Sequence, residues 1–225
     1  MAPLPAERTI LISAFEPFGA LDYNPSADLA ALLAHRAAHQ QLLCQREHGP
    51  LQLRTVTLPV EFGRAGELLT SAVAEAQPAA VVALGLAAGT DAVRLERIGV
   101  NLRDARIPDN AGAQPVDQPI AEDGPAAWFS TLRLKAAHRR IAAAEIPVRL
   151  SLSAGTYLCN EVLYTLLHHL QRNGPAVPAG FVHVPDLRSP EAPVSLDQAA
   201  AAVDLLLTES LKPLPDESIP AGSLH

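Results

Sequence analysis

VRLSLSAGTYLCNEVLYTLLHHLQR, residues 148–172, contains the change of pattern on which the fold prediction rests. Its first six residues, 148–153, alternate apolar and polar side chains, which is typical of a β-strand. After a break at 154–156, apolar residues recur at the spacing of one helix face, and 173–175 (NGP) is a typical helix end. This strand–turn–helix unit places Cys159 in the predicted first turn of the helix.

The predicted position of Cys159 suits a thiolate. The first N–H groups of a helix have no partner within the helix, and the helix dipole favours an anion there. An unperturbed cysteine, with a pKa of about 8.5, is only about 3% ionised at pH 7, and only the thiolate attacks carbonyl carbons. Cys159 is therefore a candidate nucleophile, although this stretch alone also fits a small buried apolar residue.

Composition limits the class of protein. Of 225 residues, 48% are hydrophobic and 18% are charged, which allows a substantial core. The net charge of −7 with scattered Lys and Arg argues against nucleic acid as a partner. No apolar run is long enough for a membrane span, the first ten residues lack a signal core, and two cysteines make no disulfide framework. We therefore expect a cytoplasmic protein that binds neither nucleic acid nor membrane.

The elements along the chain alternate. We predict strands at 9–15, 51–58, 79–86, 93–102, 148–153 and 180–184. We predict helices from a cap at Ser26 to about Gln40, and at 62–76, 131–145, 159–172 and 196–211. This order indicates an α/β fold, a three-layer α/β/α sandwich with a mainly parallel twisted central sheet. We expect one catalytic domain, residues 1–225, with 1–8 and 213–225 as flexible tails.

The ends of the predicted strands locate the site. In a parallel sheet, loops at the carboxyl ends of the strands meet at one edge, so the loops after Phe15, Leu86, Ser153 and Val184 should converge. The segment 104–125, rich in Pro, Gly, Asp and Asn, reads as a long loop with a possible hairpin, and long ordered loops are often functional.

Two further polar residues interrupt apolar segments. His183 lies in the strand GFVHV and Glu96 in LERIGV, next to Arg97. A buried His must be hydrogen-bonded or functional, so a satisfied core His is the alternative, and for Glu96 it is an exposed position or an ion pair. His35 and His39 have helical zinc spacing but lack the accompanying carboxylate, so we expect no metal site.

Eight segments in order along residues 9–190 carry a family resemblance. They resemble pyroglutamyl peptidase I, also called pyrrolidone-carboxylate peptidase, and are FEPFG (15–19), NPS (24–26), GLAAG (85–89), ERIGVN (96–101), DARIPDN (104–110), AWFSTL (127–132), SAGTYLCN (153–160) and GFVHVP (180–185). A set of ordered motifs is far more specific than any one of them.

The resemblance implies a cysteine peptidase with a Glu, Cys and His triad, here Glu96, Cys159 and His183. Such an enzyme hydrolyses the amide bond after an N-terminal pyroglutamyl (5-oxoproline) residue of peptides, through a thioester. The resemblance also implies a cytoplasmic α/β/α fold, no cofactor, and a homo-oligomer, usually a tetramer. Its partners would be peptides with a blocked pyroglutamyl N-terminus.

The substrate suggests which residues bind it. Pyroglutamyl is an uncharged lactam, and Phe15, Phe18 and Tyr157 can supply flat apolar walls for it. Asn24 can hold its loop or bond to the lactam. Arg106 is a candidate for assisting the oxyanion, with an ion pair that holds its loop as the alternative.

Some positions depart from the family pattern. Leu86 stands where some members have Gln, and Asp186 where an aromatic residue is often found; Ala88, Trp128 and Tyr157 also differ from common residues. These departures leave open a cysteine amidohydrolase acting on another small cyclic or N-blocked amide. An inactive pyroglutamyl-binding homologue is a second alternative, which the complete triad disfavours. A thiol redox protein is disfavoured because no C-x-x-C motif is present.

Overall fold

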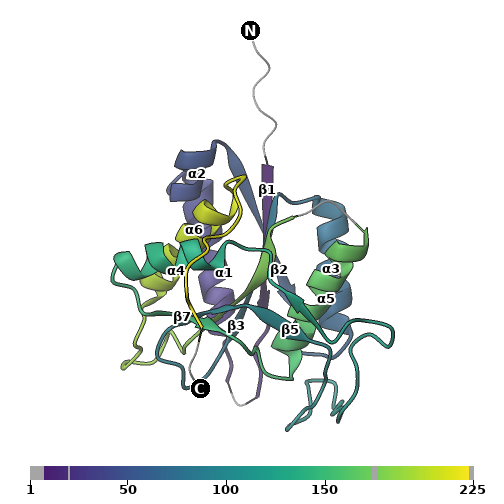
Figure 1. Cartoon of the computed structure of the whole chain (residues 1–225). Helices are drawn as coiled ribbons and strands as arrows, with labels where there is room; N and C mark the ends of the chain where they lie inside the picture. Colours follow the sequence, from purple (N-terminus) through teal and green to yellow (C-terminus); the bar gives the residue numbers. More distant parts are fainter. Residues whose placement is uncertain (1–7, 20, 174–176, 223–225) are drawn as a thin grey trace.

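The computed structural model describes residues 8–19, 21–173 and 177–222 and has a central sheet between two layers of helices (Figure 1). The strand order is β2-β1-β3-β8-β4-β7. These strands are β1 (Arg8–Phe15), β2 (Leu51–Leu58), β3 (Ala80–Leu86), β4 (Val93–Glu96), β7 (Val148–Ser151) and β8 (Ala179–Val184). All neighbours pair in parallel except β4 and β8, which confirms the predicted mainly parallel sheet.

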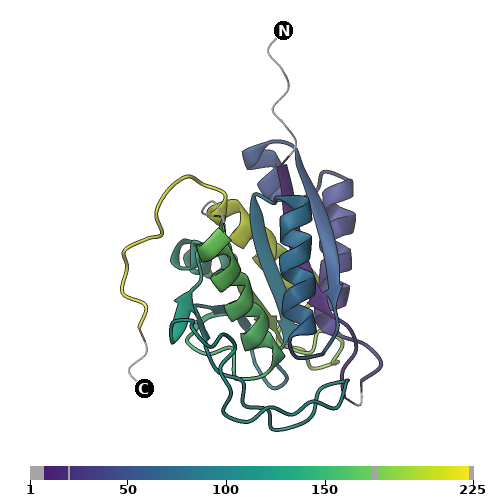
Figure 2. The same cartoon turned by 90° about the vertical axis from the view of Figure 1, so that its right-hand side faces the viewer.

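Helices cover both faces of the sheet, as predicted (Figures 1 and 2). One face packs against α1 (Pro25–Ala38), α4 (Leu134–Ala143) and α6 (Leu196–Ser210). The other face packs against α3 (Arg64–Ala76) and α5 (Leu158–Asn173). The short α2 (Leu43–His48), which we did not predict, lies against α6.

Strand β3 shows why the sequence specifies a three-layer structure. Val82 and Leu84 belong to the core beneath α1 and α6, whereas Val81 and Ala83 belong to the core beneath α3 and α5. Successive side chains of a strand point to opposite faces, so a continuous apolar run requires cover on both sides. The run AVVALG is fully buried, as predicted.

The stretch 148–172 folds as the predicted strand–turn–helix unit, although the strand ends two residues earlier than predicted, at Ser151, and the helix begins one residue earlier, at Leu158. Strand β7 is followed by a turn in which Gly155 has φ +80°, a conformation that favours glycine, and then by α5. The apolar stripe of α5, which includes Val162, Leu163, Leu166 and Leu167, packs under the sheet. Cys159 is the second residue of α5 and therefore lies in its first turn.

The predicted single strand 93–102 is divided between two sheets. The main sheet contains β4, whereas β5 (Ile98–Val100) pairs antiparallel with β6 (Ala127–Phe129), a strand we did not predict. The Asn160 side chain from α5 accepts a hydrogen bond from Val100 N–H and donates to the Val100 carbonyl, which holds β5 away from the main sheet. Both pieces are extended, so periodicity alone could not reveal the division.

The predicted cap of α1 is wrong by two residues. Asn24 is the N-cap, and its side-chain oxygen accepts hydrogen bonds from Ser26 N–H at 3.1 Å and from the Ser26 hydroxyl at 2.8 Å. Pro25 then occupies the first position of the helix, where its missing N–H costs nothing.

The predicted tails also need correction. Arg8 already belongs to β1, and residues 1–7 lie outside the described part. At the other end, 213–222 are described and make specific contacts: the Asp216 carboxylate accepts hydrogen bonds from Lys135 and Ala136 N–H at 2.9 and 3.1 Å. This carboxylate caps the positive end of α4. Among the described residues, no helix is both long and apolar enough to cross a membrane.

Candidate active site

Strands β4 and β8 bring a carboxylate and an imidazole together on one face of the sheet. In their antiparallel pairing, Arg94 lies opposite His183 and Glu96 opposite Phe181, so Glu96 and His183 are diagonal neighbours. His183 Nδ1 lies 2.8 Å from Glu96 Oε1, and both side chains are buried. This hydrogen bond fixes the ring and leaves Nε2 for another partner. The predicted partnership of Glu96 with His183 is therefore present.

Cys159 reaches the site from α5, the helix that covers this face of the sheet. A Cβ atom placed on Gly85 of β3 would lie 3.0 Å from Cys159 Sγ and 2.7 Å from Phe181 Cζ. Gly85 is the register partner of His183 in the β3–β8 pairing. The sulfur therefore lies over β3 at the level of His183, in space that only a glycine leaves open.

The electrostatics of this group favour an imidazolium. Burial lowers the pKa of His183, but Cys159 and Glu96, by charge and hydrogen bonding, outweigh burial and raise the pKa from 6.5 to about 9. At neutral pH the ring therefore carries a proton between a sulfur and a carboxylate. A thiolate paired with an imidazolium is the nucleophilic form of a catalytic cysteine.

Arg94 adds a second positive group to the buried carboxylate. Its Nε lies 3.4 Å from Glu96 Oε1, and its Nη2 donates to Ser151 Oγ at 2.6 Å and to the Ser153 carbonyl at 2.9 Å. Glu96 is fully buried, and its Oε2 has no hydrogen-bond partner among the described residues. A buried charge with an unsatisfied oxygen is costly, so the two cations on Oε1 hold Glu96 in place.

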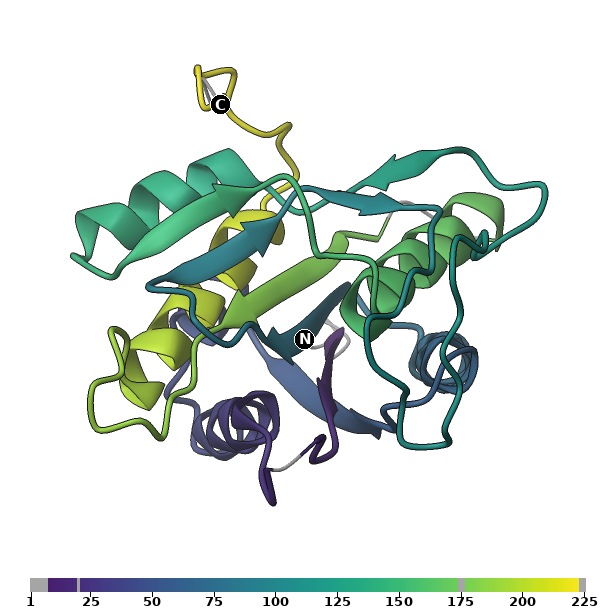
Figure 3. The same ribbon diagram turned by 90° about the horizontal axis from the view of Figure 1, so that it is seen from below.

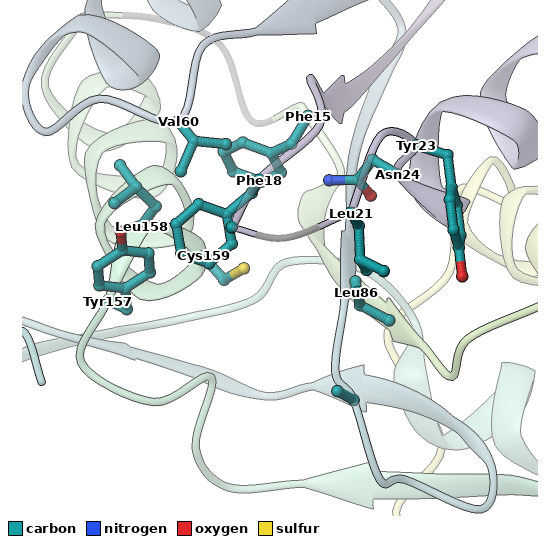
Figure 4. A pocket seen from close by; sticks show the side chains of 12 residues that line it. Phe15, Phe18, Leu21, Tyr23, Asn24, Val60, Leu86, Tyr157, Leu158 and Cys159 are labelled. Atoms are coloured by element: carbon teal, nitrogen blue, oxygen red, sulfur yellow. The ribbon is translucent and has the colours of Figure 1, made fainter. Parts of the chain in front are cut away.

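A cavity of about 370 Å³ opens beside the sulfur. Aromatic rings of Phe15, Phe18 and Tyr157 stand on one side and Leu86 on the other, with the Cys159 sulfur directed into the space between them (Figure 4). No Asp, Glu, Lys or Arg belongs to the described lining of the cavity. This lining consists of Phe15, Phe18, Gly19, Leu21, Tyr23, Asn24, Val60, Leu86, Ala88, Tyr157, Leu158 and Cys159. Figure 3 looks onto this edge of the sheet, where β1, β3 and β8 end.

Tyr157 both lines the cavity and holds its rim. Its ring packs against Phe18 at 5.5 Å and edge-on against Phe62 at 5.2 Å, measured between centroids. Its hydroxyl donates to the Pro108 carbonyl at 3.0 Å. Burial, followed by the negative charges of Asp109 and Cys159, raises the pKa of Tyr157 to about 12, so the hydroxyl keeps its proton at neutral pH.

Asn24 holds its loop. Besides capping α1, it donates from Nδ2 to the Glu16 carbonyl at 3.0 Å. Of the two roles that we considered for Asn24, the loop-holding one is therefore directly visible, and the residue also lines the cavity.

The loop 104–113 is tied down by Asp109. Its carboxylate accepts hydrogen bonds from the N–H groups of Phe62, Ala111 and Ala113 at 2.8, 3.0 and 2.7 Å. Arg106 of this loop is exposed and does not belong to the residues that line the cavity. The structure therefore does not place Arg106 in the wall of the cavity beside the sulfur.

The unusual Asp186 has a specific partner. Its carboxylate accepts a hydrogen bond from the hydroxyl of Tyr23 at 2.8 Å, and the Arg188 guanidinium lies 4.3 Å from the centre of the Tyr23 ring. Arg188 also forms a bidentate pair with Asp28. This cluster joins the loop after β8 to the loop after β1 and sets the position of a cavity wall.

Several lining residues were not predicted: Leu21, Tyr23, Val60, Ala88 and Leu158. Val60 follows the carboxyl end of β2, so the rule that located the other loops could have found it. Ala88 and Leu158 lie within the quoted motifs GLAAG and SAGTYLCN, whereas no quoted motif contains Leu21 or Tyr23. The side chains of these four residues become neighbours only in the folded chain.

Other cysteine and histidine side chains have local environments that explain them. Cys44 is buried, and burial raises the pKa of its thiol well above the usual range. His168 accepts a hydrogen bond from Trp128 Nε1 at 3.2 Å and stacks on Tyr164. Across the described part of the chain, no three His, Cys, Asp or Glu side chains gather as they would to hold a metal ion.

Comparison with known proteins identifies the family. The family model described as pyroglutamyl peptidase matches residues 8–205. A pyrrolidone-carboxylate peptidase from Pectobacterium carotovorum is 40% identical over 224 residues, covering 97% of this chain and all of that protein. One from Clavibacter michiganensis is 38% identical over 221 residues, covering 96% of this chain and 99% of that protein.

Solved structures of the same family superpose over nearly the whole chain. Pyroglutamyl peptidase I from Bacillus amyloliquefaciens superposes with a TM-score of 0.85 at 30% identity, covering 95% of this chain and 100% of that chain. Pyrrolidone carboxyl peptidase from Thermococcus litoralis gives 0.84 at 35% identity, covering 95% and 99%. The full-length matches in sequence and in structure show that the chain belongs to the pyroglutamyl peptidase family.

Proposed function

We propose that this chain removes the N-terminal pyroglutamyl residue of blocked peptides, with Cys159 as nucleophile, His183 as general acid and base, and Glu96 orienting the ring. The activity is that of the family to which the chain belongs. The observation that carries the residue assignment is the buried His183–Glu96 hydrogen bond of 2.8 Å beside the Cys159 sulfur, at an uncharged cavity.

The cavity suits a lactam better than an ordinary N-terminus. A pyroglutamyl ring is uncharged and offers flat apolar faces to Phe15, Phe18 and Tyr157. An N-terminal ammonium would lose its hydration there without gaining a carboxylate, because no acidic residue belongs to the described lining. Burying such an unpaired charge costs several kcal/mol. Specificity then comes largely from rejecting charged N-termini.

In the first half-reaction, the Cys159 thiolate attacks the carbonyl carbon of the scissile amide. Two N–H groups in the first turn of α5, those of Leu158 and Cys159, have no acceptor within the helix and can stabilise the resulting oxyanion. The imidazolium of His183 gives its Nε2 proton to the departing amine as the carbon–nitrogen bond breaks. The products of this step are a shortened peptide and a pyroglutamyl thioester on Cys159.

In the second half-reaction, water hydrolyses the thioester. The neutral His183 ring takes a proton from the water as its oxygen attacks the carbonyl carbon. The carbon–sulfur bond then breaks, which releases pyroglutamate and restores the thiolate–imidazolium pair. Glu96 stabilises the imidazolium at the start and the end of the cycle.

The test is hydrolysis of a pyroglutamyl aminomethylcoumarin amide by the parent chain and by two matched cysteine variants. We expect Cys159→Ala to abolish hydrolysis and Cys44→Ala, made in the buried thiol, to retain it. Folding of each variant is checked by circular dichroism. Turnover by a folded Cys159→Ala variant would overturn the assignment of the nucleophile.

We also propose that the chain acts as a single catalytic domain, in the cytoplasm, and as a homo-oligomer, with a tetramer implied by the resemblance. A reducing compartment keeps thiols such as Cys44 and Cys159 free, which supports the cytoplasmic assignment. Light scattering on the purified protein measures the oligomeric state, and a monomer at micromolar concentration would contradict that part of the proposal.

A further inference from the structure

A second hollow, of about 510 Å³, lies next to the apolar cavity. Ala88 lines both of them, so the two spaces share a wall. Unlike the first, the second has charged residues in its lining, which consists of Ala88, Gly89, Thr90, Asp91, Arg94, Arg149, Leu150, Ser151 and Leu152. None of these residues is assigned to the catalytic steps above.

The register of the sheet places this hollow beside the general acid. Arg94 lies opposite His183 in the β4–β8 pairing and opposite Arg149 in the β4–β7 pairing. The three residues therefore form a row across neighbouring strands, and paired residues of a sheet point to the same face. Arg94 also contacts Glu96, the partner of His183. The row therefore runs from His183 of the proposed triad, through Arg94, to Arg149 in the lining of the hollow.

The way the substrate lies across the site indicates which part of it reaches the hollow. The pyroglutamyl ring occupies the apolar cavity, and His183 must reach the departing amine nitrogen. The residue that begins with this nitrogen therefore lies on the His183 side of the sulfur, toward Arg94 and Arg149. We propose that the hollow is the subsite for the residue that follows pyroglutamate and that Arg149, with Arg94, selects a carboxylate on that residue. This inference rests on the proposed function.

The charges of the hollow favour an anion. Its lining holds two guanidinium groups and one carboxylate, Asp91. Arg149 Nη2 contacts Asp91 Oδ2 at 2.6 Å, but both side chains are about two-thirds exposed, at 65% and 66%. An exposed ion pair is weak, so a substrate carboxylate can share or replace it. Glu96 contacts Arg94 at 3.4 Å and His183 at 2.8 Å through the same oxygen, so its single negative charge is shared between two cations and does not neutralise both.

Two kinds of substrate can offer this carboxylate. One is a pyroglutamyl dipeptide, through its terminal α-carboxylate, and the other is a longer peptide with Asp or Glu after pyroglutamate. Two matched pairs separate them: pyroglutamyl-alanine against its amide, and pyroglutamyl-glutamate α-amide against pyroglutamyl-glutamine α-amide. In each pair the two substrates differ in one charge and hardly in shape.

The experiment measures kcat/KM for these four substrates at low ionic strength. For at least one pair, we expect the parent to prefer the carboxylate about two- to five-fold, the range of an exposed ion pair. Arg149→Gln should bring that ratio close to one, and Asp91→Asn should increase it, because the internal competitor is gone. Added salt should reduce the parent's ratio. Arg54→Gln, in another exposed pair on β2, is the matched control and should leave the ratio unchanged.

Two outcomes overturn the inference. One is a parent ratio near one for both pairs, and the other is an Arg149→Gln variant that slows all four substrates equally. Either result leaves the proposed function standing as long as pyroglutamyl-alanine amide is cleaved. Failure of the parent to cleave any of the four would instead overturn the proposed function, so the two failures are distinguishable.

Discussion

Replacing Glu96 by Gln tests the electrostatic basis of the site most directly. The change keeps the shape of the side chain and removes the negative charge that accepts the His183 Nδ1 hydrogen bond at 2.8 Å. Although burial lowers the pKa of His183, Cys159 and Glu96 raise it to about 9, and the variant loses the contribution of Glu96. Arg94, 3.4 Å from the same oxygen, also loses its anionic partner.

The size of the effect follows from the bond that is lost. A hydrogen bond to a charged group contributes about 1.5–3 kcal/mol, and one pKa unit corresponds to about 1.36 kcal/mol. The pKa of His183 should therefore fall by about one to two units in Glu96→Gln. Because the imidazolium protonates the departing amine, the alkaline limb of kcat/KM should move from about pH 9 to between about 7 and 8. At pH 7 this shift should cost at most about two-fold in kcat/KM, because at least about half of the His183 rings remain protonated. Near pH 10 the variant should be about ten- to a hundred-fold slower than the parent, because a fall of one to two pKa units reduces the imidazolium population by that factor.

The assay is hydrolysis of a pyroglutamyl aminomethylcoumarin amide between pH 5 and about 10, at substrate concentrations well below KM so that the free enzyme is titrated. Glu75→Gln, an exposed position on α3 with an 81% exposed side chain, is the control and should reproduce the parent profile. If Glu96→Gln lowered the rate without moving the alkaline limb, Glu96 would be acting on shape alone, and the electrostatic reasoning would be refuted.

Three further predictions concern the thiols, the glycine beneath the sulfur and the charged imidazole. Iodoacetamide should inactivate the enzyme by labelling Cys159, whereas Cys44, buried and with a raised pKa, should stay unlabelled on peptide mapping. Gly85→Ala should lower kcat/KM at least ten-fold and the free energy of unfolding in urea by about 1–3 kcal/mol, because the added Cβ would lie 3.0 Å from the Cys159 sulfur. Gly222→Ala is the control and should change neither quantity, because no atom beyond its chain neighbours lies within 4 Å of the Cβ that it would add. The raised pKa of His183 should contribute about 3 kcal/mol to the free energy of unfolding below pH 6.5, and this contribution should be lost as the pH rises through about 9. Urea titrations of His183→Gln across the same pH range should lack this dependence.

The sequence alone was sufficient for the layers of the fold and for the choice of the three residues that we propose as a triad. A continuous apolar strand such as AVVALG must be covered on both faces, and an apolar stripe at helical spacing must face a core; both rules are local, so they can be read from the chain. The first helical turn at Cys159 followed from the same local change of period. The family resemblance then connected this residue with Glu96 and His183, which local patterns could not do.

The tertiary structure decided how these residues meet and what surrounds them. The antiparallel β4–β8 pairing sets Glu96 diagonally to His183, and no local pattern reveals which way two distant strands run. The same pairing brings Arg94 to the carboxylate and places Arg149 one strand further along. Contacts between residues far apart in sequence depend on register and strand order, which are properties of the whole sheet and not of any segment. The sequence therefore indicates which residue types are available for the proposed chemistry. How Glu96, His183 and Cys159 are arranged is decided only when the strands pair in the sheet.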